Sequence, residues 1–148
     1  DLDVRFIEFM PLGSARDWTS KDVHTARETR AAIESRWSLR PFDGDHAHST
    51  SVNWTFADGA DGKLGFIAPV SQPFCGACNR LRITAEGRIR PCLFSHDEWD
   101  LKPILRRGSS NVELERFLID AAWNKQSGHA IGEETFEQPE RSMSAIGG

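Results

Sequence analysis

Cysteine is scarce in this sequence: its 148 residues include three, and all three lie between positions 75 and 92. An odd number of cysteines in one short stretch does not supply the disulfide framework that holds small secreted domains together. No apolar run approaches the ~20 residues that a membrane-spanning helix needs. No signal-peptide pattern opens the chain. We therefore expect a cytoplasmic protein with no membrane partner.

A positive net charge is also absent. The formal net charge is −4 at pH 7, which gives no support to general nucleic-acid binding. Internal repeats and low-complexity segments are missing as well. With 39% hydrophobic residues, the chain is long enough to bury a real core.

The cysteines follow the spacing C-x2-C-x13-C, from Cys75 through Cys78 to Cys92. Two thiolates two residues apart can turn onto one metal, and a third that returns after a hairpin completes a face suited to zinc or an iron–sulfur cluster. His96 follows Cys92 by four positions and could close a zinc site, so spacing alone favours zinc at least as strongly as iron–sulfur. A thioredoxin-like C-x-x-C is the weakest alternative, because the strand-then-helix context is missing.

The residues between the last two cysteines predict a β-hairpin. If residues 85–87 form a three-residue loop with Gly87 in the left-handed conformation, Arg82 faces Arg90 across the hairpin. One surface should then carry the cysteines and arginines while the other, apolar surface packs down. The first set is Cys78, Arg80, Arg82, Arg90 and Cys92, and the second is Leu81, Ile83 and Ile89. Arginines beside a metal predict an anionic ligand, because guanidinium groups suit phosphate and carboxylate oxygens.

The rest of the chain alternates strands with helices. The predicted elements are a strand over 4–9, a helix from Thr19 to about Trp37, strands over 52–56 and 64–69, and helices over 100–107 and from Ser110 to about Lys125. The two middle strands and the cysteine hairpin should share a small antiparallel sheet. The first strand has no visible partner upstream, so we interpret it as an internal strand of a larger barrel. His46 and His48 lie in a polar loop, where we expect them to be solvated.

The run FCGACNRLRITAEGRIRPCLF, at 74–94, resembles the C-terminal cluster motif of molybdenum-cofactor biosynthesis protein A, the family of radical-SAM GTP 3',8-cyclases. Four other segments agree with this family: RFIEFMPLG at 5–13, GFIAPVS at 65–71, RSM at 141–143 and the terminal IGG. The resemblance spans nearly the whole chain. It favours a [4Fe-4S] cluster over zinc, because the arginines after Cys78 and the double-glycine end have no role in a zinc ribbon.

The resemblance implies an α/β fold in two parts. Residues 1–40 would supply a late strand and helix of an incomplete (β/α) radical-SAM barrel. Residues 41–148 would form a C-terminal domain, a small antiparallel sheet with helices, that holds the [4Fe-4S] cluster and GTP. The C-x3-C-x2-C motif of the N-terminal barrel half is absent, so that half is a missing partner. A second copy of the chain and the downstream cyclic pyranopterin monophosphate synthase are further candidate partners.

The resemblance also implies roles for individual residues. The cluster ligands would be Cys75, Cys78 and Cys92; GTP would contact Arg80, Leu81, Arg82 and Arg5; S-adenosylmethionine would touch Met10; and Gly147 and Gly148 would enter the active site as a catalytic tail. The implied reaction is the conversion of GTP to (8S)-3',8-cyclo-7,8-dihydroguanosine 5'-triphosphate, a lyase step of molybdenum cofactor (molybdopterin) biosynthesis. We expect this chain alone to be unable to cleave S-adenosylmethionine, because the first cluster motif is missing.

Overall fold

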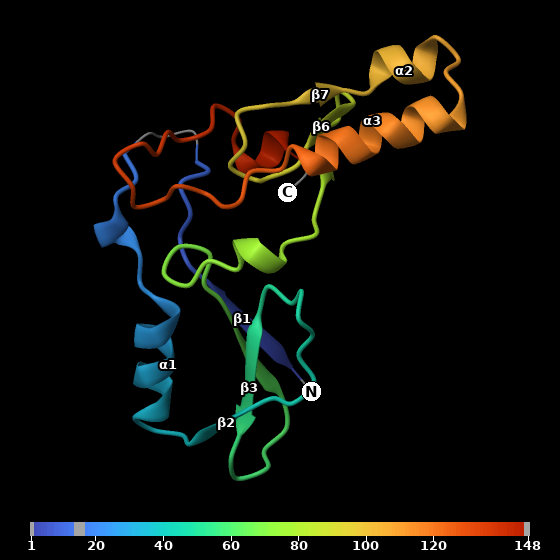
Figure 1. Cartoon of the computed structure of the whole chain (residues 1–148). Coiled ribbons are helices and arrows are strands. Elements are labelled where there is room, and N and C mark those ends of the chain that lie inside the picture. Colours follow the sequence, from blue (N-terminus) through green and yellow to red (C-terminus); the bar gives the residue numbers. More distant parts are fainter. Residues whose placement is uncertain (1, 14–16, 147–148) are drawn as a thin grey trace. The chain divides into compact units, whose positions relative to one another are not determined.

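The computed structural model describes residues 2–13 and 17–146, which form two compact units. The first unit comprises residues 2–10 and 17–78, and the second comprises residues 11–13 and 79–146. Both contain strands and helices, so the predicted α/β class is confirmed (Figure 1). The units divide between Cys78 and Asn79, inside the cysteine motif. The expected division at residue 40 stays a prediction.

A mixed four-stranded sheet with the order β1-β4-β3-β2 forms the first unit. Its strands are β1 (Asp3–Ile7), β2 (Leu39–Pro41), β3 (Val52–Phe56) and β4 (Lys63–Ile67). Strand β1 runs parallel to β4 with Phe6 opposite Phe66, and the two rings stack with centroids 5.6 Å apart. The sequence predicted β1, β3 and β4. It missed β2, because three residues that end in a proline carry almost no periodic signal.

Helix α1 (Ala26–Glu34) is shorter than the predicted helix. Thr19 does begin helical structure, but its capping box with Asp22 starts only a 3₁₀ helix (Ser20–Asp22). A second capping box, between Thr25 and Glu28, then starts α1. The sequence contains both capping boxes, and the helix follows the second one.

The second unit holds a separate three-stranded antiparallel sheet with the order β5-β6-β7. The strands are β5 (Arg82–Ile83), β6 (Arg88–Arg90) and β7 (Trp99–Asp100). The expectation that the hairpin shares a sheet with β3 and β4 is therefore wrong. The second edge of β6 pairs with β7 instead, with Ile89 opposite Trp99.

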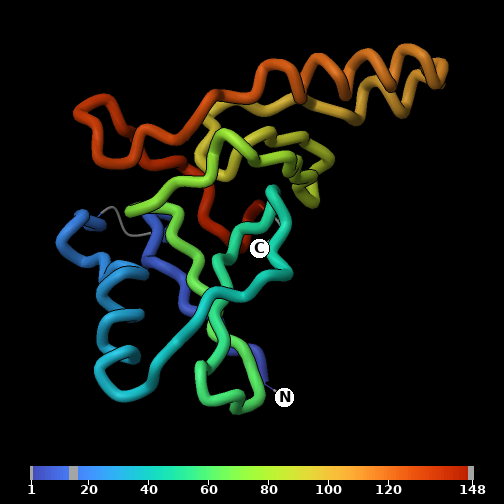
Figure 2. The backbone as a smooth tube through the Cα atoms, turned by 60° about the horizontal axis from the view of Figure 1, so that its bottom comes forward, coloured from blue at the N-terminus to red at the C-terminus, as the bar shows by residue number. Residues whose placement is uncertain are grey.

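Two helices and an irregular tail complete this unit. Helix α2 (Lys102–Arg106) ends before Gly108, which has a φ of 70°, and α3 (Asn111–Trp123) begins at the capping box of Ser110 with Glu113. The end of α2 and the start of α3 agree with the sequence prediction. Within the described residues, the chain after α3 forms no strand and one 3₁₀ helix (Met143–Ala145). Figure 2 shows the backbone path of this tail. The largest fully buried side chains of the described residues all belong to this unit: Pro11, Ile89, Pro91 and Ile146.

Candidate metal and substrate site

The first two cysteines lie on a tight turn in the first unit. Cys75–Ala77 form a 3₁₀ helix, closed by hydrogen bonds from the Ala77 nitrogen to the Phe74 oxygen (3.3 Å) and from the Cys78 nitrogen to the Cys75 oxygen (3.1 Å). Both side chains are half-buried. A turn of this kind brings the side chains of a C-x-x-C pair to one locality, as a shared metal requires.

A buried carboxylate, that of Glu8, anchors the loop that leads into this turn. Its side chain accepts hydrogen bonds from the backbone nitrogens of Val70 (3.0 Å), Ser71 (2.9 Å) and Ala26 (2.9 Å), and from the Ser71 hydroxyl. Glu8 is 4% exposed. Burial alone would raise the pKa of Glu8, but these hydrogen bonds outweigh it and lower that pKa below its ordinary value.

Glu8 therefore ties together the end of β1, the start of α1 and the loop before Cys75. No motif in the sequence assigned a role to Glu8, although it stands in the RFIEFMPLG segment. The available signal was an acidic residue at the end of an apolar strand, where a charge needs several partners.

The predicted substrate residue Arg5 lies on β1 opposite Gly65 of β4, and its side chain is exposed. A Cβ added at Gly65 would lie 3.2 Å from the Arg5 Cγ and 2.7 Å from the Asn53 Oδ1, and it would also contact the Ser51 Oγ. Because Gly65 has no side chain, the aliphatic part of the Arg5 side chain can pass over this position. Met10, the residue expected to contact S-adenosylmethionine, is half-buried three positions after the end of β1.

The hairpin register agrees with the sequence prediction. Arg82 pairs with Arg90, Ile83 pairs with Ile89, and Gly87 has a φ of 76°. This left-handed glycine ends the three-residue loop, as expected for a hairpin of this length.

The predicted burial of the two hairpin faces is only partly right. Ile89 is 1% exposed, but Leu81 and Ile83 are 42% and 59% exposed. Arg90 is 3% exposed rather than solvated, because its guanidinium forms an ion pair with Glu98 (2.6 Å) and a hydrogen bond to the Ser95 oxygen. Glu98 lies beside β7, and the sequence prediction did not include that third strand.

The two arginines expected to bind substrate, Arg80 and Arg82, are half-buried on either side of the exposed Leu81. The Lys125 ammonium donates a 2.9 Å hydrogen bond to the Arg80 backbone oxygen. Lys125, two positions after the end of α3, therefore holds the backbone of the arginine segment in place, a contact that no sequence pattern indicated.

Cys92 is half-buried in the second unit, directly after the buried Pro91. Among the described residues, no group of three or more histidine, cysteine, aspartate or glutamate side chains is arranged to hold a metal ion. Because the cysteines belong to two units, with two thiols in one and the third in the other, the three-thiol site stays a prediction. The Nε2 of His96, the fourth zinc ligand considered above, lies 3.1 Å from the Glu137 oxygen.

The chain approaches its C-terminal glycines through a well-anchored segment. Arg141 forms ion pairs with Glu98 (2.7 Å) and Glu86 (3.3 Å), and the Met143 nitrogen donates to the Leu12 oxygen (3.1 Å). Ile146 is fully buried. Gly147 and Gly148, predicted to form the catalytic tail, lie outside the described residues.

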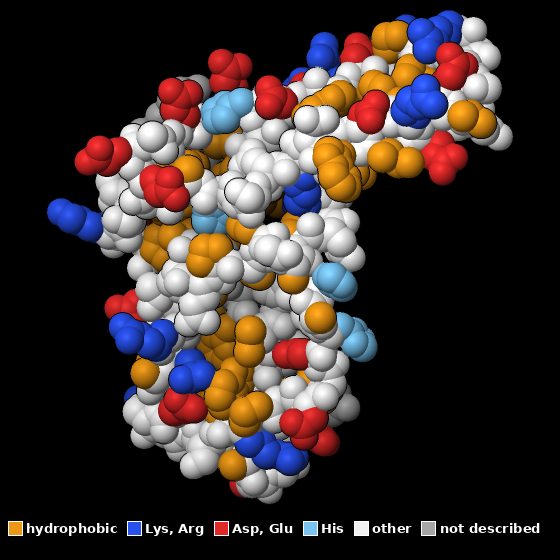
Figure 3. Space-filling model, viewed as in Figure 1, with side chains coloured by type: hydrophobic (Ala, Val, Ile, Leu, Met, Phe, Trp, Pro, Cys, Tyr) orange, Lys and Arg blue, Asp and Glu red, His pale blue; other side chains and the backbone are white. Residues whose placement is uncertain are grey.

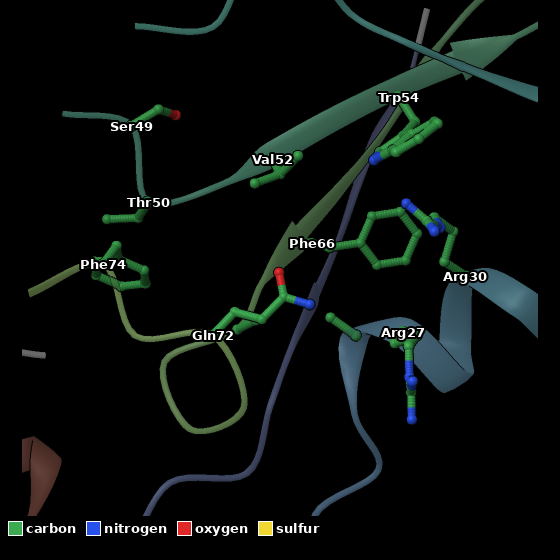
Figure 4. Close-up of a pocket in the computed structure, with 11 residues that line it drawn as sticks. Arg27, Arg30, Ser49, Thr50, Val52, Trp54, Phe66, Gln72 and Phe74 are labelled. Atoms are coloured by element: carbon green, nitrogen blue, oxygen red, sulfur yellow. The ribbon is translucent and has the colours of Figure 1, made fainter. Parts of the chain in front are cut away.

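A hollow lies between α1 and the sheet of the first unit (Figures 3 and 4). It has a volume of about 180 Å³ and is lined mainly by apolar side chains, among them Trp54 and Phe66, with the Gln72 amide at one end. Arg30 stacks over the Trp54 ring at 4.4 Å. Strand alternation places Phe6 and Phe66 on the face opposite that of Arg5, so Arg5 does not face this hollow.

The fold and the motif together define a class: an α/β protein in two units, built around a C-x2-C-x13-C segment with adjoining arginines. Residues 2–131 match the family model described as Molybdenum Cofactor Synthesis C. The chain belongs to this family. No helix among the described residues has both the length and the apolar character needed to cross a membrane.

Curated relatives agree with this membership. A GTP 3',8-cyclase of Corynebacterium glutamicum is 43% identical over 98% of this chain and 40% of its own length. A GTP 3',8-cyclase of Streptomyces coelicolor is 38% identical over 100% of this chain and 43% of its own length. A GTP 3',8-cyclase of Paenarthrobacter nicotinovorans is 43% identical over 99% of this chain and 45% of its own length. The chain thus spans less than half the length of these relatives.

Proposed function

We propose that this chain is the C-terminal, substrate-binding part of a GTP 3',8-cyclase and binds GTP at a [4Fe-4S] cluster. One observation carries the proposal. The 3₁₀ turn of Cys75 and Cys78 is followed directly by Arg80 and then by a hairpin that begins at Arg82 and has the predicted register. Soft thiolate ligands and anion-binding guanidiniums are therefore adjacent along one short stretch of chain.

The three cysteines fit such a cluster by their chemistry. All three are half-buried, and thiolate sulfur is the usual protein ligand of iron–sulfur clusters. His96 places its Nε2 against the Glu137 oxygen, so Nδ1 is the ring nitrogen that a closed zinc site would use. When bound, a cluster with three thiolate ligands supplies one iron that has no protein ligand and is open to the guanine base.

The other residues of the site would bind and orient the substrate. Arg80 and Arg82 would donate to the triphosphate oxygens, Leu81 would provide an apolar contact, and Arg5 would also contact GTP. Correct orientation of a bound reactant is worth up to about 7–11 kcal/mol in well-aligned systems. The contribution of this chain is therefore positioning.

The remaining chemistry would come from the rest of a longer protein. An N-terminal barrel half with its own cluster would cleave S-adenosylmethionine, against which Met10 would pack, and Gly147 and Gly148 would enter the active site. We place the protein in the cytosol, where a reducing environment keeps the three thiols available for metal. Its product would pass to the next enzyme of molybdenum cofactor synthesis.

Nucleotide affinity tests the proposal. The chain is reconstituted anaerobically with iron and sulfide, and GTP binding is measured by titration calorimetry. Arg82→Ala should weaken GTP binding about 10- to 100-fold, because one charge-assisted hydrogen bond is lost. Arg106→Ala, an exposed arginine of α2, is the control and should bind like the unmodified chain. Equal affinities in both variants would contradict the assignment of Arg82 to substrate.

A second assay tests the expected division of labour. The reconstituted chain is incubated anaerobically with S-adenosylmethionine and dithionite, and 5'-deoxyadenosine is quantified. We expect no more product than in a cluster-free control. Appreciable product would show that this chain cleaves S-adenosylmethionine alone.

A further inference from the structure

The loop that contains His46 and His48 is exposed, as the sequence predicted, and hydrogen bonds also hold it in a defined conformation. Asp45 accepts hydrogen bonds from the backbone nitrogen of Asn53 (2.8 Å) and from its side-chain amide. The Ser49 nitrogen donates to the His46 oxygen (2.9 Å), and the Ser49 hydroxyl donates to the Ser51 oxygen (2.9 Å). These bonds fasten the loop to the start of β3.

This loop brings His48 to the turn that carries the first two cysteines. The Nδ1 of His48 lies 2.7 Å from the backbone oxygen of Ala77, the residue directly before Cys78. A carbonyl oxygen can only accept a hydrogen bond, so Nδ1 carries the proton and donates. Both residues belong to the first unit, so the contact lies within one compact body.

We propose that His48 is a positioning residue that holds the C-x-x-C turn closed. The peptide between Ala77 and Cys78 sets the direction of the Cys78 side chain relative to Cys75, and the imidazole fixes the oxygen of that peptide. A hydrogen bond of this kind reduces the conformations that the two thiols sample before metal arrives. The role of the turn as a metal site rests on the proposed function, whereas its restraint by His48 does not.

The restraint is measured on the metal-free chain by alkylation with iodoacetamide, and rates for individual cysteines are read by peptide mass spectrometry. His48→Ala should raise the rates at Cys75 and Cys78 about two- to tenfold, the population change expected when one neutral hydrogen bond is lost. Cys92 belongs to the other unit and should keep its rate. His46→Ala is the matched control on the same loop and should leave all three rates unchanged.

A conservative variant distinguishes positioning from general stabilisation. The amide nitrogen of asparagine is as many bonds from Cα as the Nδ1 of histidine, so His48→Asn should restore the slow rates. The amide of His48→Gln is one bond longer and should restore them poorly. Asp45→Ala, which releases the loop, should behave like His48→Ala.

Two results would overturn the inference. Either the rates at Cys75 and Cys78 stay unchanged in His48→Ala, or all three cysteines accelerate together because the whole chain has loosened. The result is independent of nucleotide binding. A chain that binds no GTP but shows the selective acceleration would contradict the proposed function and leave the role of His48 intact.

Discussion

The Glu8 carboxylate accepts a 2.9 Å hydrogen bond from the backbone nitrogen of Ser71, a residue 63 positions later in the chain. Ser71 stands at the start of the loop that ends in Cys75, and Glu8 stands directly after β1. The bond therefore couples the first strand to the cysteine turn. Two backbone segments that carry predicted site residues are fixed by one charged group.

Glu8→Gln should lower the free energy of unfolding by about 2–4 kcal/mol. The amide replaces one acceptor oxygen with a donor and so leaves buried backbone N–H groups without a partner. Urea denaturation followed by circular dichroism measures the change. Glu34→Gln is the control: Glu34 forms an exposed ion pair with Arg30, and such pairs contribute about 0–1 kcal/mol. Equal losses in the two variants would refute the anchoring role of Glu8.

The same carboxylate predicts a pH dependence. The hydrogen bonds to the Glu8 carboxylate lower its pKa in the folded chain below the ordinary value of 4.5. A group with a lowered folded pKa contributes stability above its unfolded pKa and loses it as the pH falls through the folded pKa. The unmodified chain should therefore lose stability below about pH 4.5 more steeply than Glu8→Gln. Parallel stability curves across that range would contradict this.

Gly65→Ala should disturb the support of Arg5. The new methyl would lie 2.7 Å from the Asn53 Oδ1 and would contact the hydroxyl of the buried Ser51, two groups that are already hydrogen-bonded to each other at 2.8 Å. Overpacking of this kind costs about 1–3 kcal/mol. Urea denaturation should show this loss of stability. Titration calorimetry should show a weaker affinity for GTP. Gly76→Ala is the control, because its methyl would lie in open space. If Gly76→Ala and Gly65→Ala had the same free energy of unfolding, the loss at Gly65 would not come from a steric clash.

Glu98 should matter more for stability than its partner Arg141. Glu98→Gln leaves the guanidinium of Arg90, which is 3% exposed, without its charge partner, and such a loss costs about 3–5 kcal/mol. Arg141→Ala removes a side chain that is 28% exposed and should cost about 1 kcal/mol or less. Thermal unfolding ranks the two variants. The reverse order would show that Glu98 is not the centre of this ion cluster.

The Arg141 variant should also loosen the C-terminal segment. Hydrogen exchange in residues 138–146 should accelerate in Arg141→Ala, because the ion pairs to Glu86 and Glu98 are lost. Arg107→Ala breaks an exposed pair with Glu113 and serves as the control. Unchanged exchange in both variants would mean that the buried Ile146 anchors the segment without Arg141.

Features set by neighbouring residues could be predicted from the sequence. The hairpin register follows from alternation together with Gly87, and the start of α3 follows from Ser110 and Glu113. Thr25 and Glu28 could have given the start of α1 by the same rule.

Features set by distant residues could not be predicted. Arg90 was expected on a solvated face, because nothing near it in sequence shows that β7 will cover the other edge of β6. The contact between His48 and Ala77 spans 29 positions, and the bond between Lys125 and Arg80 spans 45. Polar contacts at such separations depend on how the elements pack, which periodicity does not encode.

The identity of the metal that the three cysteines bind is the most direct test of the proposed [4Fe-4S] site. The chain is purified without oxygen, reconstituted with iron and sulfide, and analysed for iron, sulfide, zinc and visible absorption beside its Cys75→Ser and His96→Ala variants. We expect a brown protein with one [4Fe-4S] cluster per chain, lost in Cys75→Ser and kept in His96→Ala. A colourless chain that holds one zinc ion and loses it in His96→Ala would contradict the proposed cluster.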